Sequence, residues 1–162
     1  MATAVRIGTC SFADEALVRH WYPKGVPARE RLAYYASQFS TVEIDSTYYR
    51  LPSRSMVQGW ADRTPGGFVV HIKAFGLMTR HPVGLAQLPP DMRDGMPVDA
   101  RGRVDRPSRE LRGAVFRRFL EALEPLREAG KLGGILFQLP PYIAWGTPVL
   151  DYLEWARAQL GT

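Results

Sequence analysis

The stretch Thr41-Val42-Glu43-Ile44-Asp45-Ser46-Thr47-Tyr48-Tyr49 decides the fold of this 162-residue chain. Side chains on a β-strand alternate between its two faces, so Glu43 and Asp45 share one face while Val42 and Ile44 share the other. A strand in this register packs its apolar side under a helical layer and directs two carboxylates into an enclosed polar space. The polar and aromatic residues that follow are typical of a strand that opens into a ligand-facing loop.

Apolar periodicity places this strand in a series of alternating strands and helices. Strands are expected at residues 5–9, 41–45, 68–73 and 134–138. Helices are expected from Ala28 to Phe39, from an N-cap at Ser53 through Trp60, from a cap at Ser108 through Leu126, and over an amphipathic segment from Leu150 to Leu160. The alternation predicts an α/β fold with parallel strands and right-handed helical crossovers.

One connection departs from the pattern, because residues 74–107 are far longer than the two to six residues usual for a loop of this kind. The segment is rich in proline and arginine. It is interpreted either as a lid over the strand ends or as a mobile insertion.

Charge and cysteine content limit the partners and the kinds of protein that this sequence can represent. The net charge of +5 comes from 21 Lys and Arg against 16 Asp and Glu, and arginine carries nearly all of it. Arginine suits phosphate contacts, so a phosphorylated small molecule or nucleic acid is a candidate partner. The alternative is that the preference for arginine over lysine comes from the base composition of the genome. The acidic residues are also interspersed among the basic ones.

The single cysteine, Cys10, excludes an internal disulfide. No apolar run is long enough for a membrane span and no signal peptide is evident, so a cytoplasmic protein without membrane partners is expected.

Polar side chains follow all four expected strands, at the carboxyl ends where parallel α/β folds bind ligands. Carboxylates, an imidazole and an ammonium in one cavity would couple their titrations, which marks acid–base or metal chemistry. The candidate catalytic residues are Glu43, Asp45, His71 and Lys73, and a divalent metal could be held by Glu43, Asp45 and His71. The candidate ligand-binding residues are Thr9, Ser11, Tyr48, Tyr49, Thr79, Arg80, His81 and Gln138.

Each candidate has a structural alternative. Glu43 and Lys73 could form an ion pair that serves fold specificity, and His71 could be a satisfied interior histidine. His81 is either an exposed loop residue or a binder of phosphate. The aromatic residues could pack rather than stack on a ligand. The standard metalloprotease, P-loop, dinucleotide and CxxC motifs are missing from the sequence.

The order of several short motifs resembles the YecE-like family, catalogued as domain of unknown function 72. The matching stretches are Ile7-Gly8-Thr9-Cys10-Ser11-Phe12, Trp21-Tyr22-Pro23, Tyr34-Tyr35 with Phe39, residues 41–49, Trp60 with Thr64-Pro65 and Phe68, His71-Ile72-Lys73-Ala74, Thr79 with His81, and residues 132–141. The family commonly has Ser at the position of Cys10 and Trp at that of Phe12, and its Thr-His pair is split here by Arg80.

The resemblance implies a TIM barrel, which needs about 250 residues for its eight βα units. Residues 1–162 would then be the N-terminal portion of such a barrel, with about four units, and residues 74–107 an insertion within it. The family's later motifs have no counterpart in the sequence. Half a barrel leaves two open edges, so the expectation is a truncated barrel or self-association through those edges.

Three functional interpretations remain open. The first is an uncharacterised barrel enzyme, a hydrolase or lyase acting on a phosphorylated or nucleic-acid ligand. The second is a non-catalytic binding or scaffold protein, in which residues 101–118 offer an arginine-rich surface to an acidic partner. The third is an inactive fragment, because a site built from eight strand ends should not survive the loss of four.

Overall fold

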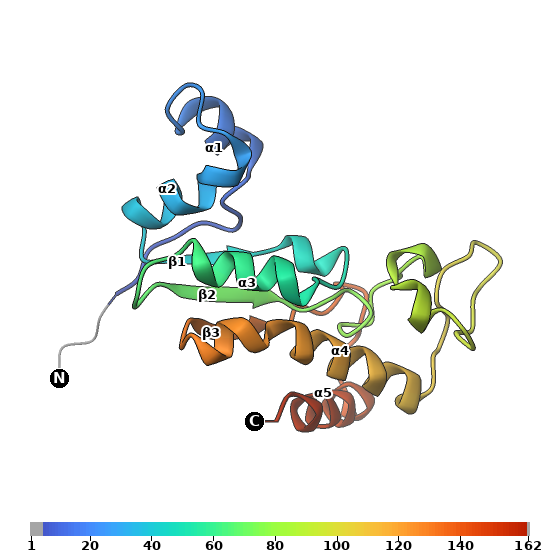
Figure 1. Cartoon of the computed structure of the whole chain (residues 1–162). Coiled ribbons are helices and arrows are strands. Elements are labelled where there is room, and N and C mark those ends of the chain that lie inside the picture. The colour runs from blue at the N-terminus through green and yellow to red at the C-terminus, as the bar shows by residue number, and fades with distance from the viewer. Residues whose placement is uncertain (1–4, 162) are drawn as a thin grey trace. The chain divides into compact units, whose positions relative to one another are not determined.

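Three parallel strands organise the first of two compact units in the chain, for which a computed structural model describes residues 5–161. The strands are β1 (Thr41–Ile44), β2 (Val69–Lys73) and β3 (Leu132–Leu136), in the order β1-β2-β3 (Figure 1). Of the described residues, the first unit comprises 5–46, 53–73 and 123–136, and the second comprises 47–52, 74–122 and 137–161. The chain is thus a mixed α/β protein with a parallel sheet, as the sequence predicts.

The apolar sides of β1 and β2 form the core of the first unit. Val42, Ile44, Val70 and Ile72 are all almost completely buried. The residues between them, Glu43 and His71 among others, are half-buried or exposed. The alternation predicted from the sequence is therefore confirmed for both strands.

Helices of the first unit begin close to where the sequence predicts. The first predicted helix is a short 3-10 turn (Ala28–Glu30) followed by α2 (Arg31–Gln38). Helix α3 (Arg54–Asp62) starts with the backbone N–H of Met56 donating to Ser53 Oγ over 3.1 Å, which confirms the N-cap.

Helix α1 (Glu15–His20) is missing from the sequence-based prediction. It has six residues, none of them buried, so it carries no apolar stripe that periodicity could detect. Its signal was the cap at Asp14, whose carboxylate accepts from the backbone N–H of Ala16 over 2.8 Å.

The predicted first strand at residues 5–9 is wrong. Val5 and Ile7 are 84% and 70% exposed, so nothing covers the apolar side that a strand would need. Pairing with β1 is reduced to a single parallel bridge between Cys10 and Glu43. Two backbone hydrogen bonds support it, from Glu43 N to Thr9 O (3.1 Å) and from Ser11 N to Glu43 O (2.8 Å).

The last predicted strand is displaced, because β3 begins at Leu132 rather than Gly134 and ends at Leu136. Lys131, just before it, donates from Nζ to the backbone oxygens of Ala61 (2.6 Å) and Thr64 (2.5 Å). These bonds hold the start of β3 beside the end of α3. Gln138 consequently lies two residues beyond the strand rather than at its end.

The second unit contains the other long helices and the long connection. It includes the first part of α4 (Arg109–Glu128), whose predicted cap is confirmed by the N–H of Leu111 donating to Ser108 Oγ over 3.1 Å. Helix α5 (Thr147–Leu160) contains the predicted amphipathic segment. The core of the second unit includes Phe75, Met78, Phe116 and Phe119, all with no exposed surface.

Residues 74–107 form a folded part of this second unit. They contain 3-10 turns at Leu85–Gln87 and Pro90–Met92 and two antiparallel bridges, Gly84 with Arg103 and Val98 with Val104. Val83, Leu88 and Val104 are buried. A lid role for this segment stays a prediction.

Helices long and apolar enough to span a bilayer were not found among the described residues. Residues 1–4 lie outside the described part of the chain. The prediction that they lead into the first strand without a signal peptide therefore concerns residues that the structure does not describe.

Gly133 allows β3 to approach β2 closely. A Cβ on Gly133 would lie 2.2 Å from Cγ1 of Val69 and 2.8 Å from Cε1 of His71, whereas a Cβ on Gly66 would meet no atom within 4 Å. We expect Gly133→Ala to lower the free energy of unfolding by about 1–3 kcal/mol, because the strands or side chains must shift. Gly66→Ala, as the matched control, should stay within about 0.5 kcal/mol. Urea unfolding of both variants checks this, and equal stabilities would contradict the close approach.

Candidate functional site

The polar face of the sheet in the first unit brings chemically active side chains into one row. Glu43 is the register partner of His71 on β2 and forms the bridge with Cys10 on its other side. His71 in turn pairs with Gly134 on β3. Neighbouring strands lie about 4.8 Å apart, so Glu43 sits between a thiol and an imidazole.

A second row lies one step further toward the carboxyl ends of the strands. Lys73 is the last residue of β2, and Asp45 follows the last residue of β1, which is paired with Ile72. Both side chains are half-buried, and both charges act on the Cys10 thiol. The structure therefore gathers all four candidate catalytic residues on one face of the first unit.

The pKa of Cys10 responds to the charged side chains on this face. Its thiol donates to Oε1 of Glu43 over 3.3 Å. Desolvation of the sulfur, then the hydrogen bond with Glu43 and the charges of Glu43 and Asp45, raise the pKa of Cys10 to about 11, although the residue as a whole is exposed. The opposing effect of Lys73 is smaller. Cys10 is thus held as a neutral thiol, which argues against a role as nucleophile.

A shallow hollow of about 320 Å³ opens along the first row. Its polar lining is a cation, two hydroxyls, a thiol, a carboxylate and an imidazole. These belong to Arg6, Thr9, Thr41, Cys10, Glu43 and His71. Glycines at positions 133 and 134 leave the β3 side of His71 without a side chain, so the imidazole stays exposed.

Thr9 and Ser11, predicted to bind ligand, mainly hold the backbone that enters this hollow. Thr9 Oγ1 donates to the backbone oxygen of Ser11 over 2.8 Å, and Thr9 N donates to the Tyr35 hydroxyl over 2.7 Å. Ser11 Oγ accepts from the N–H of Ala13, and Ser11 has a φ of +84°, in the left-handed region. Only Thr9 of the two lines the hollow.

The other predicted ligand-binding residues belong to the second unit. The Tyr48 ring lies edge-on to the rings of Tyr49 and His81, each at 4.9 Å between centroids. Thr79 is buried and its hydroxyl is 2.8 Å from Nδ1 of His81. These four residues form one cluster, whereas Gln138 is exposed.

A metal set of Glu43, Asp45 and His71 is not assembled in this structure. Within residues 5–161, no three His, Cys, Asp or Glu side chains are placed so that they could hold one ion together.

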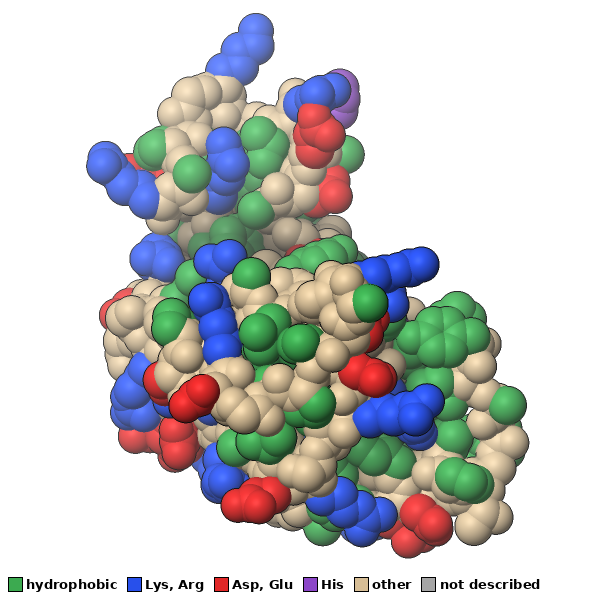
Figure 2. Space-filling view, turned by 90° about the vertical axis from the view of Figure 1, so that its right-hand side faces the viewer, with side chains coloured by type: hydrophobic (Ala, Val, Ile, Leu, Met, Phe, Trp, Pro, Cys, Tyr) green, Lys and Arg blue, Asp and Glu red, His purple; other side chains and the backbone are tan. Residues whose placement is uncertain are grey.

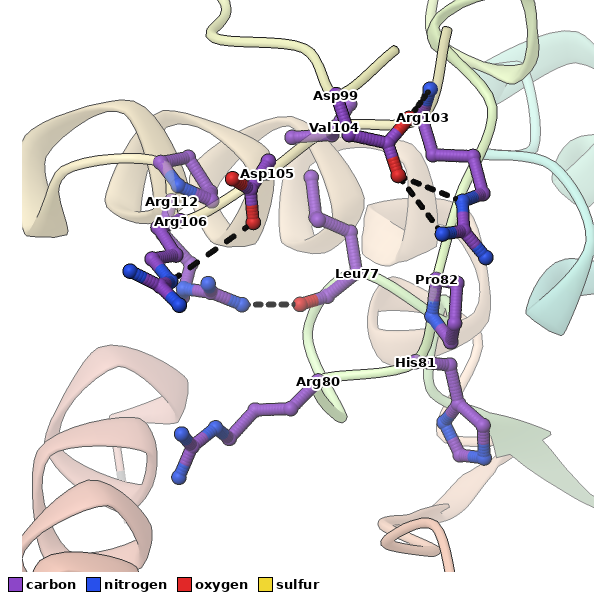
Figure 3. A pocket seen from close by; sticks show the side chains of 11 residues that line it. Leu77, Arg80, His81, Pro82, Asp99, Arg103, Val104, Asp105, Arg106 and Arg112 are labelled. Carbon is purple, nitrogen blue, oxygen red and sulfur yellow. Dashed lines mark hydrogen bonds and ion pairs between the residues drawn. The ribbon is translucent and has the colours of Figure 1, made fainter. Parts of the chain in front are cut away.

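Sequence reasoning missed a pocket in the second unit, shown in Figure 3. It is lined by Arg80, Arg103, Arg106 and Arg112. The sequence signal for this pocket was the density of arginines in residues 101–118. From the sequence, these arginines are interpreted as an open surface for an acidic partner.

Comparison with known proteins places the chain within one family. The family model described as "Protein of unknown function DUF72" matches residues 6–162. UPF0759 protein YunF of Bacillus subtilis (strain 168) is 27% identical over 157 residues, which are 97% of this chain and 47% of that protein.

Solved structures of DUF72 family proteins share the fold. The protein from Thermotoga maritima MSB8 has a TM-score of 0.67 and 24% identity, over 97% of this chain and 52% of that one. The protein from Enterococcus faecalis V583 has a TM-score of 0.67 and 22% identity, over 96% and 47%. The chain thus spans about half the length of the relatives it matches.

Glu43→Gln should make Cys10 more reactive. Removing the carboxylate charge removes part of what disfavours the thiolate, so the pKa of Cys10 falls and the rate of alkylation by iodoacetamide at a given pH rises. The pH profile of alkylation, which should have its midpoint near 11 in the unchanged chain, measures this. Glu30→Gln, at an exposed residue of the same unit, is the control. An unchanged profile in Glu43→Gln would show that Glu43 does not control the thiol.

Proposed function

Because the chain belongs to the DUF72 family, whose function is unknown, we propose a function from its own geometry: the polar face of the sheet is an acid–base site of a hydrolase or lyase. The observation that carries the proposal is the pairing of Glu43 with His71 on neighbouring strands, on the face opposite the buried core. Proton transfer by a positioned histidine is the commonest form of general acid–base catalysis.

The roles follow from the position of each side chain. His71 is exposed at the hollow and takes or gives the proton of the reacting group. Glu43, its register partner, orients the imidazole and stabilises its protonated form. Lys73, one step further along β2, stabilises developing negative charge, and Asp45 is the second base.

We propose for the fold that residues 1–162 correspond to about four βα units of a TIM barrel. Parallel strands joined through helices, with polar residues at their carboxyl ends, support this. Matches that cover 47% to 52% of longer relatives agree with it.

The ligand class is a phosphorylated small molecule in preference to nucleic acid. Figure 2 shows Lys and Arg side chains interspersed with Asp and Glu on the surface that faces the viewer. A clustered basic patch or stripe is the usual footprint of a nucleic-acid-binding protein. Arg6, which lines the hollow on the sheet, offers one cation to a phosphoryl group.

Hydrolysis of p-nitrophenyl phosphate and bis(p-nitrophenyl) phosphate tests the catalytic proposal. We expect His71→Asn and Glu43→Gln each to lower the rate by about 10²- to 10⁴-fold, because each removes one partner of the proton-transfer pair. Circular dichroism confirms that the variants fold, and Glu30→Gln serves as the matched carboxylate control. Full activity in both site variants, or no turnover of either ester by the folded unchanged chain, would contradict the proposed hydrolase.

A salt titration separates the ligand classes and addresses the alternative of a non-catalytic binding protein. We expect the affinity for a fluorescent single-stranded oligonucleotide to be weak and to change little between about 50 and 200 mM salt. A protein that contacts six to ten phosphates loses about 10³- to 10⁵-fold over that range. Fluorescence anisotropy measures the slope, and a steep loss would favour nucleic acid as the ligand.

A further inference from the structure

A pocket of about 250 Å³ in the second unit has an excess of positive charge. Four arginines and two aspartates line it, namely Arg80, Arg103, Arg106, Arg112, Asp99 and Asp105. Figure 3 shows Arg80, Arg106 and Arg112 on one side of the pocket, and the pair of Asp99 with Arg103 on the other. The pocket lies wholly within residues 77–112.

Asp99 and Arg103 neutralise each other. Arg103 donates from Nε to Oδ2 of Asp99 over 2.9 Å and has Nη2 2.7 Å from the same oxygen. The other oxygen accepts from the backbone N–H groups of Arg101 and Arg103, each over 2.9 Å. These hydrogen bonds lower the pKa of Asp99, so it stays ionised and committed to Arg103. The charge available to a ligand therefore comes from the other three arginines.

Arg80 and Arg112 both lie against one aromatic ring. Their guanidinium carbons lie 5.4 and 5.5 Å from the centroid of Tyr152. Arg112 is also fixed by donating from Nη1 to the backbone oxygen of Leu77 over 2.5 Å. An arginine has five N–H donors, and Arg112 uses part of them for Leu77 and for the Tyr152 hydroxyl. Both arginines line the same pocket, so an anion in the pocket would be attracted by both charges.

Arg106 completes the set with a nearly free side chain. Its side chain is 94% exposed, and its contact with Asp105 is a loose one of 3.9 Å between Nε and Oδ1. An exposed pair of this kind contributes little to stability. The guanidinium is therefore able to turn to a ligand.

The backbone at this pocket is strained. Arg80 has a φ of +65° and Arg106 a φ of +45°, and in residues 5–161 the other non-glycine residue with positive φ is Ser11. The left-handed region costs an ordinary residue about 1–2 kcal/mol, and such residues cluster at ligand-binding sites. Glycine would relieve this strain, but it would also remove the guanidinium groups from the pocket.

We propose that this pocket binds a doubly charged phosphoryl group, of a phosphate monoester or of free phosphate, through Arg80, Arg106 and Arg112. Planar guanidinium groups match the oxygen geometry of phosphate. At about 250 Å³ the pocket is smaller than the roughly 300–1,000 Å³ typical of sites for whole drug-sized ligands, so it fits one anionic group. The proposal stands whether or not the polar face of the sheet is catalytic.

Calorimetric titration of the whole chain with inorganic phosphate and with glycerol phosphate, at low ionic strength, tests the site. We expect both anions to bind, the monoester at least as tightly as free phosphate. The double variant Arg80→Asn with Arg106→Asn should weaken binding at least tenfold. Asparagine tolerates positive φ, so the backbone keeps its conformation while two charges are lost.

Arg101→Asn is the matched control, because Arg101 is exposed in the same segment and does not line the pocket. A double control, Arg101→Asn with Arg109→Asn, removes the same total charge from exposed residues and should change the affinity less than threefold. Equal weakening in both double variants would mean a general charge effect and would overturn the proposal. Failure of the unchanged chain to bind either anion would overturn it as well.

Discussion

The burial of one face of two adjacent parallel strands is the constraint on which the rest of the structure depends. Val42 and Ile44 on β1, and Val70 and Ile72 on β2, are almost fully buried, and each contributes about 1.5–3 kcal/mol of transfer free energy. A slip of either strand by one residue would bury Glu43 or His71 in their place. The packing that stabilises the first unit therefore also fixes the register that makes these two side chains neighbours.

The sequence predicts the elements that this constraint governs and fails where other forces decide. Strands β1 and β2 and the caps at Ser53 and Ser108 are local patterns, and all are confirmed. The segment at residues 5–9 has the alternating apolar residues of a strand, but no other described part of the chain covers them. Whether such cover exists depends on distant residues and cannot be predicted from the segment itself. The start of β3 is set by Lys131, whose partners lie more than 60 residues earlier in the sequence.

The candidate sites divide in the same way. Glu43, Asp45, His71 and Lys73 follow from alternation along strands, so their common face could be predicted. The arginine pocket is built from two loops and a helix, and the sharing of Tyr152 by Arg80 and Arg112 leaves no pattern in the sequence. Of its residues, only Arg80 and His81 were among the predicted ligand-binding set. Loop sites of this kind depend on turn geometry, including two positive φ angles at arginine.

The environment of Cys10 determines how its thiol responds to oxidants. With a pKa of about 11, roughly one thiol in 10⁴ is ionised at neutral pH, and the thiolate is the form that attacks peroxide and disulfides. The chain has no other cysteine. A covalent disulfide between two copies would have to form through this thiol, and Glu43 suppresses that reaction. Desolvation of the sulfur and the Glu43 carboxylate together therefore hold this thiol in its neutral form, which reacts slowly with oxidants.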